Sequence, residues 1–137
     1  MLKGTLIHPE ILYSLASAGH GSRVLIADGN YPASTKEGPN TNTVYLNLTP
    51  GIVKVTDVLN CLTSTIEIEE AYVMCPESGE EPTIFNEFRK LLQSLELKRL
   101  GRFEFYELAS SPETALQIVT ADQRLYANIL LTIGVVK

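Results

Sequence analysis

The order of apolar segments constrains the fold of this 137-residue chain more than any other feature. Short apolar runs bounded by turn residues alternate with segments in which apolar residues recur every three or four positions. The first pattern is typical of buried strands and the second of amphipathic helices. Their alternation predicts an α/β fold with helices covering a sheet. We therefore expect one three-layer α/β/α domain over residues 1–137, with a mixed, mainly parallel central sheet.

The boundaries of the expected elements follow from the turn residues between them. The helical pattern is clearest over residues 84–95, where an unbroken apolar stripe lies along one face. Pro9 suits the first turn of a helix, and Gly19 suits the residue that ends it. The expected helices are 9–18, 53–62, 84–95 and 111–115. The expected strands are 23–27, 43–48, 66–74, 103–106, 117–120 and 129–133.

Charge and cysteine content exclude several classes of protein. The formal net charge is -5, which argues against a nucleic-acid or anionic membrane partner, since either requires a basic surface. The chain has no apolar run long enough for a membrane span, and its first residues lack the apolar core of a signal peptide. Cys61 and Cys75 lie in apolar contexts, so we interpret them as buried, reduced thiols rather than as a disulfide or a metal site. This composition fits a cytoplasmic location.

Two short polar segments beside apolar runs are the candidates for a functional site. Gly19-His20-Gly21 precedes the strand 23–27, and Asp28 follows it directly. Ligands of α/β sheets bind at the carboxyl ends of strands, where Asp28 is expected to lie. His20 is expected at the opposite end of that strand, so a hairpin-like loop or a neighbouring subunit would have to bring it to Asp28. Tyr126 and Asn128 are expected to face the same side of an extended segment.

Each of these residues also has a purely structural interpretation. A histidine between two glycines is either an ordinary turn residue or an accessible general acid or base, because imidazole titrates near neutral pH. Asp28 could cap nearby backbone amides, and Tyr126 and Asn128 could be ordinary polar residues at a strand edge. The sequence contains no glycine-rich phosphate loop, dinucleotide fingerprint, zinc-ligand cluster or serine nucleophile elbow. Acid–base chemistry is the reaction type that remains.

The order and spacing of several segments resemble the ribose pyranase and fucose mutarotase family. The resemblance covers nearly the whole chain, and it is specific because the segments occur together at these spacings. The matching segments are Met1–Gly4, the helix 9–18 with Gly19-His20-Gly21, the strand ending in Ala27-Asp28 with Pro32 beyond it, residues 102–107, and residues 126–131 with Gly134-Val135.

The resemblance implies an activity, an assembly and a set of site residues. Members of the family interconvert cyclic forms of a free monosaccharide without a cofactor or a metal. They form rings that stack into homodecamers, with pockets shared between neighbouring subunits. His20 corresponds to the proton donor of the family, and Arg102 corresponds to a sugar contact of its fucose branch, placed before the expected strand 103–106. The residues assigned to the sugar are Asp28, Arg102, Tyr126, Ala127 and Asn128.

The motifs favour the fucose branch, and the mechanism they imply is acid–base opening of the sugar ring. Gly19-His20-Gly21, Pro32-Ala33 and residues 105–107 are similar to the fucose branch. Residues 29–31 and Ala121-Asp122 depart from it, and these positions are expected near the pocket. We therefore expect an L-fucose mutarotase, and the alternatives are a D-ribose pyranase and a non-catalytic sugar-binding or sugar-transport accessory protein.

Overall fold

A computed structural model describes all residues from Met1 to Lys137 and contains four helices and six strands. The helices are α1 (Pro9–Ser17), α2 (Val55–Thr63), α3 (Ile84–Leu92) and α4 (Arg102–Ala109). The strands are β1 (Arg23–Ala27), β2 (Asn42–Tyr45), β3 (Ile68–Met74), β4 (Leu97–Leu100), β5 (Thr114–Val119) and β6 (Ile129–Ile133).

All six strands form one mixed, mainly parallel sheet, as the sequence predicted. The strand order is β2-β5-β1-β6-β3-β4. Three neighbouring pairs are parallel, namely β1 with β5, β2 with β5, and β3 with β4. The strand β6 runs antiparallel to both of its neighbours, β1 and β3. It is therefore the one strand of the sheet with reversed direction.

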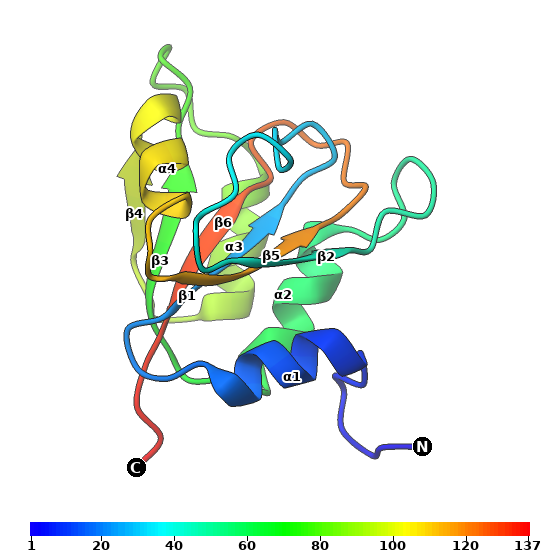
Figure 1. The fold of residues 1–137 in the computed structure, drawn as a ribbon. Coiled ribbons are helices and arrows are strands. Elements are labelled where there is room, and N and C mark those ends of the chain that lie inside the picture. Colours follow the sequence, from blue (N-terminus) through cyan, green and yellow to red (C-terminus); the bar gives the residue numbers. More distant parts are fainter.

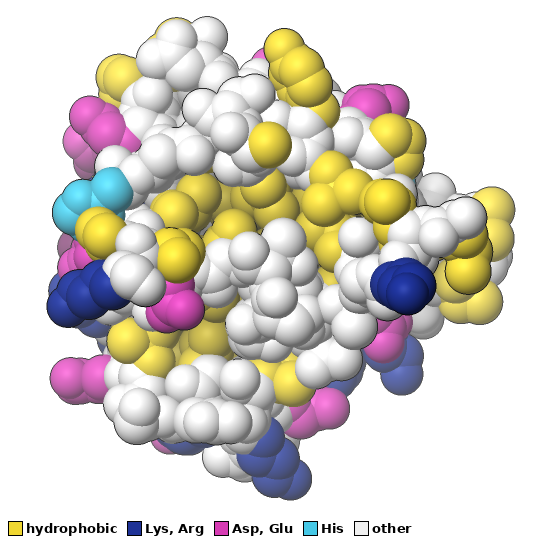
Figure 2. Space-filling view, turned by 90° about the horizontal axis from the view of Figure 1, so that it is seen from below, with side chains coloured by type: hydrophobic (Ala, Val, Ile, Leu, Met, Phe, Trp, Pro, Cys, Tyr) yellow, Lys and Arg dark blue, Asp and Glu magenta, His cyan; other side chains and the backbone are white.

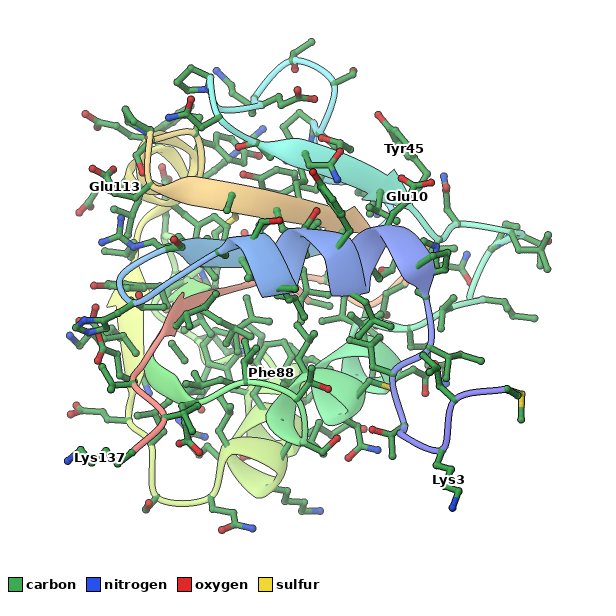
Figure 3. All side chains as sticks on the ribbon, turned by 60° about the horizontal axis from the view of Figure 1, so that its bottom comes forward. Lys3, Glu10, Tyr45, Phe88, Glu113 and Lys137 are labelled. Atoms are coloured by element: carbon green, nitrogen blue, oxygen red, sulfur yellow. The ribbon has the colours of Figure 1, made fainter.

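Helices cover both faces of this sheet, which confirms the three-layer arrangement (Figure 1). The larger core joins α1, α2 and α3 to one face, and it includes the fully buried Phe85 and Phe88 of α3. Phe88 lies in the interior beneath the sheet, whereas Tyr45 at the edge strand β2 points outward (Figure 3). The smaller core packs α4 against the other face through Phe105 and Ala109. The two cores enclose the sheet between apolar layers.

The strand directions gather the connecting loops at two opposite edges of the sheet. One edge collects the carboxyl ends of β1 to β5 and the amino end of β6, and we call it the carboxyl edge. The other collects the amino ends of β1 to β5 and the carboxyl end of β6, and we call it the amino edge. Residues that are distant in the sequence therefore meet wherever they adjoin strand ends of the same edge.

The second half of the chain differs from the sequence-based expectation in three places. Residues 103–106 belong to helix α4 and not to a strand. Residues 111–115 are not a helix, since 111–113 form a turn and 114–115 begin β5. The strand β4 was not expected, because its sequence Leu97-Lys98-Arg99-Leu100 is half charged. It is an edge strand, and its two charged residues are exposed to solvent.

None of the four helices has the length and apolar character that a membrane span requires. Cys61 and Cys75 are free cysteines, and both are half-buried rather than buried as expected. Cys75 packs against the margin of the larger core.

Candidate active site

Five of the six predicted site residues lie at the carboxyl edge, and His20 lies at the amino edge. Asp28 follows the end of β1, Arg102 follows β4, and the segment 126–128 precedes β6. His20 lies in the loop between α1 and β1, at the far end of the same strand from Asp28. Within one subunit the sheet therefore separates the candidate proton donor from the candidate sugar contacts.

Asp28 and Asn128 form a reciprocal hydrogen-bonded pair at the centre of the carboxyl edge. The backbone N–H of Asp28 donates to Oδ1 of Asn128 over 2.8 Å, and Nδ2 of Asn128 donates to Oδ2 of Asp28 over 3.0 Å. The N–H of Asn30 donates to Oδ1 of Asp28 over 2.9 Å. Because β1 and β6 are paired, the last residue of one strand lies beside the segment that leads into the other. The pair joins two segments that are 100 positions apart in the sequence.

Burial sets the charge preference of Asp28. The residue is 5% exposed, and loss of hydration disfavours a carboxylate. Burial therefore raises the pKa of Asp28 above its ordinary value, even though the N–H groups of Asn30 and Asn128 oppose this effect. A carboxylate of this kind accepts hydrogen bonds strongly, because water does not compete at the site.

The segment before Asn128 is a turn, and not the extended chain that the sequence suggested. Tyr126 has a positive φ of 59°, which is uncommon for a non-glycine residue. Ala127 is fully buried, and Asn128 is nearly so. Tyr126 and Asn128 therefore do not lie on one face of a strand, although they remain neighbours at the same edge.

Arg102 is the first residue of α4, and aromatic rings hold its guanidinium group. Its Nε donates to the hydroxyl of Tyr106 over 3.1 Å, one helical turn further along. The guanidinium carbon lies 5.6 Å from the ring centroids of both Phe103 and Tyr106. The hydrogen bond to Tyr106 raises the pKa of Arg102 further above its already high value. The other guanidinium nitrogens of Arg102 have no protein partner, so they can bind a ligand.

Tyr31 belongs to the segment 29–31 that was expected near the pocket, but the sequence assigned no role to it. It is buried, and its ring packs edge-on against Phe105 and Tyr106, with centroid distances of 6.2 and 5.4 Å. Its hydroxyl is buried without a hydrogen-bond partner. Burial raises the pKa of Tyr31 well above its ordinary value, and the nearby Tyr106 and Asp28 add to this shift. Tyr31 therefore packs against the ring of Tyr106, the residue whose hydroxyl binds Arg102.

His20 at the amino edge has one side-chain partner, which is Glu69. Nε2 of His20 lies 3.0 Å from each carboxylate oxygen of Glu69 in β3. The side chain of His20 is 58% exposed, so Nδ1 is available to a molecule that approaches from outside. Gly21 has a φ of +85°, which a side chain would disfavour, so this glycine is required for the turn. Glu69 lies in the expected strand 66–74, but nothing in the sequence linked it to His20, which is 49 positions away.

The surface is hollowed at both edges, but in separate places. His20 borders a pocket of about 660 Å³ together with Tyr13 and Ser17 of α1. At the carboxyl edge, one pocket of about 410 Å³ includes Gly29 and Asp122, and another of about 470 Å³ includes Tyr126. No group of three or more His, Cys, Asp or Glu side chains is placed to hold a metal ion. The chemistry available is therefore an exposed imidazole at one edge and hydrogen-bonding groups at the other.

Comparison with known proteins gives consistent matches over nearly the full length. Residues 1–136 match the RbsD / FucU transport protein family. The chain is 30% identical to the fucose mutarotase of Homo sapiens, covering 98% of this chain and 94% of that protein. It is 31% identical to the D-ribose pyranase of Variovorax paradoxus (strain S110), covering 98% of both chains. A crystal structure of the fucose mutarotase from Streptococcus pneumoniae in complex with L-fucose superposes with a TM-score of 0.83 and 25% identity, covering 96% of this chain and 95% of that one.

Proposed function

The chain belongs to the RbsD / FucU transport protein family, and we propose that it is a monosaccharide mutarotase, an isomerase that interconverts the anomers of L-fucose. The observation that carries this proposal is the match of 98% of the chain to an enzyme named fucose mutarotase. The family match confirms the resemblance inferred from the motifs. The hydrogen-bonded Asp28–Asn128 pair supports the proposal, because a sugar presents hydroxyl groups that a carboxylate and an amide can bind.

The proposed mechanism is acid–base opening and closing of the sugar ring without a cofactor. His20 delivers a proton to the ring oxygen as the bond between that oxygen and the anomeric carbon breaks, and the anomeric hydroxyl releases its proton to water. The open-chain aldehyde then rotates and closes on either face by the reverse proton transfers. Asp28 accepts hydrogen bonds from sugar hydroxyls, while Arg102 donates hydrogen bonds to sugar oxygens. Tyr126, Ala127 and Asn128 border the ring and orient it. A positioned proton transfer contributes about 10²–10⁴-fold to a rate, which suffices for a reaction that already proceeds in water.

The position of His20 makes a shared site part of the proposal. Because His20 and Asp28 lie at opposite ends of β1, one site requires the amino edge of one subunit to meet the carboxyl edge of another. Such a head-to-tail contact forms a ring when the rotation between neighbouring subunits closes on itself. Exposed apolar side chains at both ends support this arrangement: Ile7 and Tyr13 lie around α1, and Leu48 and Leu125 lie in loops of the carboxyl edge. Figure 2 shows apolar side chains spread over the surface seen from the α1 end. We propose a homodecamer of stacked rings.

A cytoplasmic location is proposed on separate grounds. Cys61 and Cys75 are both unpaired and half-buried. Free thiols are typical of reducing compartments, where disulfides rarely persist.

Exchange between sugar anomers, followed by NMR saturation transfer, tests the proposed activity. Saturating the resonance of one L-fucose anomer should reduce the signal of the other faster when the protein is present. His20→Gln should abolish this acceleration. The matched control is His8→Gln, which changes the other histidine of the chain, located at the start of α1, and should retain the activity. Full exchange by His20→Gln would contradict the proton-donor role.

The ribose pyranase alternative has one observation in its favour, which is the 31% identity to a D-ribose pyranase. Repeating the measurement with D-ribose, and following transfer between pyranose and furanose signals, separates the two activities. Faster exchange for ribose than for fucose would favour the pyranase. Binding of either sugar without faster exchange would favour a non-catalytic sugar-binding protein.

A further inference from the structure

We propose that Asp122 and Arg124 are positioning residues that fix the sugar-contacting loops of the carboxyl edge relative to each other and to the helical layer. This inference rests on the proposed mutarotase function. It concerns two residues that make no contact with His20 and that the motifs left without a role. We call the two residues the Asp122–Arg124 clamp.

The carboxylate of Asp122 is saturated with charged and backbone donors. Arg124 donates to it in a bidentate manner, from Nε to Oδ1 over 2.9 Å and from a terminal nitrogen to Oδ2 over 2.7 Å. The N–H of Arg124 donates to Oδ1 over 3.1 Å, and the N–H of Val55 donates to Oδ2 over 2.9 Å. Although burial alone would raise the pKa of Asp122, the donors from Arg124 and Val55 lower it below its ordinary value. The pair is therefore ionised at neutral pH.

Arg124 extends the clamp into the helical layer. A terminal guanidinium nitrogen donates to the Thr56 hydroxyl of α2 over 3.0 Å, and the other pairs with Glu87 of α3. Together with the bond from Val55, these contacts anchor the loop to the first turn of α2 and to α3. The planar guanidinium group makes all of these bonds at once, which a lysine ammonium cannot do.

The backbone of Asp122 also fixes the loop that carries Asp28. The N–H of Gly29 donates to the carbonyl oxygen of Asp122 over 2.9 Å. A Cβ atom at position 29 would lie 3.3 Å from that oxygen, so glycine permits this close approach. On the strand side, the Thr120 hydroxyl accepts from the N–H of Asp122 over 3.2 Å and donates to the carbonyl of Ala27 over 2.7 Å. Asp28 is thus held between two residues that are bonded to the segment 120–122.

The same clamp holds the start of the turn that contains Tyr126. Arg124 directly precedes Leu125 and Tyr126, and Tyr126 has the unfavourable φ of 59°. A residue in this conformation persists only where its surroundings hold it there. Leu125 is exposed and does not fix the turn by packing. The anchor on the amino-terminal side of the turn is therefore Arg124. On the carboxyl-terminal side the anchor is the Asp28–Asn128 pair.

The clamp should therefore govern sugar binding more than the proton transfer, because His20 lies at the opposite edge. We expect Arg124→Lys to raise the KM for L-fucose about tenfold and to leave kcat near the wild-type value, since displaced contacts weaken binding steeply. The matched control is Arg89→Lys, which alters the ion pair with Glu81 on the surface of α3 and should leave KM unchanged. Asp122→Asn is a second variant that removes the charge and keeps the shape.

The readouts distinguish a positioning role from a purely structural one. A structural role would lower the thermal midpoint and the active fraction, and hence kcat, without changing KM. Unchanged KM values in both Arg124→Lys and Asp122→Asn, measured below their thermal midpoints, would overturn the proposal. Failure of the proposed function is seen separately, as a lack of anomer exchange by the wild type. In that case the Kd for L-fucose replaces KM, and equal Kd values for wild type and Arg124→Lys would overturn the clamp.

Discussion

At the scale of single residues, Asp28 combines burial with two hydrogen-bond donors, and this combination determines how the site responds to pH. Its pKa is raised from 3.8, because burial outweighs the donors. Between 3.8 and the raised value the folded state binds more protons than the unfolded state. The contribution of Asp28 to stability is therefore greatest below 3.8 and is lost as the pH rises through this window. At neutral pH the buried, ionised carboxylate of Asp28 therefore lowers the free energy of unfolding.

This property yields a prediction for sugar binding. As the pH falls through the raised pKa of Asp28, the carboxylate gains a proton and becomes a weaker hydrogen-bond acceptor for the sugar hydroxyls. The KM for L-fucose should therefore rise. The inflection should lie above 3.8, the ordinary value of an aspartate. Saturation-transfer rates at a series of sugar concentrations and pH values measure it. Asp28→Asn should bind weakly at every pH, and a pH dependence of KM that survives in this variant would assign the titration to another group.

Two buried threonines provide a prediction for stability. Thr114 and Thr120 are both fully buried, but the Thr114 hydroxyl has no partner, whereas the Thr120 hydroxyl bonds Ala27 and Asp122. Thr→Val keeps the shape and removes the hydroxyl. We expect Thr120→Val to lower the free energy of unfolding by about 1–3 kcal/mol and Thr114→Val to leave it unchanged or raise it by up to about 1 kcal/mol. Urea unfolding at one fixed protein concentration measures both, and equal losses would mean that water or a neighbouring subunit binds the Thr114 hydroxyl.

At the scale of elements, helix α4 shows where sequence periodicity misleads. Residues 102–107 read Arg-Phe-Glu-Phe-Tyr-Glu, in which polar and aromatic residues alternate as they do in a half-buried strand. In the structure Gly101 precedes the first turn of a helix, and the two phenylalanines point in different directions. The short length of the segment allowed both interpretations, and packing against β3 decides between them. By contrast, the long apolar stripe of α3 and the short apolar run of β1 each allow only one interpretation.

The two phenylalanines of α4 test this assignment. A strand would place Phe103 and Phe105 on one face, whereas residues two positions apart on a helix differ by about 200°. Accordingly Phe105 is 0% exposed and Phe103 is 74% exposed. Phe105→Ala should lower the free energy of unfolding by about 3–5 kcal/mol at any protein concentration. Phe103→Ala should cost less than about 1 kcal/mol in dilute protein, where subunits are apart, and similar large losses in both variants would contradict the helix.

The carboxyl edge shows which parts of a site the sequence can reveal. The sequence placed Asp28 correctly, because a residue that follows a buried strand lies at a predictable sheet edge. It also separated His20 from Asp28 correctly, for the same reason. It placed Tyr31 and Asp122 only as positions near the pocket, and it missed Glu69, Arg124 and the contacts of the clamp with α2 and α3, because those contacts join segments that are distant in the sequence. Periodicity locates a residue on its own element, but only the packed sheet brings a residue of β3 to the loop before β1.

At the scale of the whole molecule, the sheet divides the proposed chemistry between its two edges. The proposed proton donor, His20, has one side-chain partner, Glu69, and is otherwise exposed, while Asp28 and Asn128 form a buried pair at the opposite edge. In the proposed arrangement, a monomer presents two half-sites and no complete one. Because the edges differ, the proposed contact between them is heterologous, and every subunit would contribute one half to each of two sites. The exposed apolar side chains at both ends are the surface that such contacts would cover.

Mixing one variant of each edge tests this division directly, at a sugar concentration far below the KM of Asp28→Asn, where sites without Asp28 contribute little. A His20→Gln subunit keeps its carboxyl edge, and an Asp28→Asn subunit keeps its amino edge. When the two chains are co-expressed in equal amounts and purified as a mixed assembly, half of the sites contain an intact His20, and half of those contain an intact Asp28. We expect anomer exchange at about one quarter of the wild-type rate, because each shared site draws its two halves from different subunits. The control is a mixture of His20→Gln with the double variant His20→Gln/Asp28→Asn, which contains no wild-type site. If light scattering confirms a mixed assembly of about ten subunits and the first mixture is as inactive as the control, the two edges do not form one site.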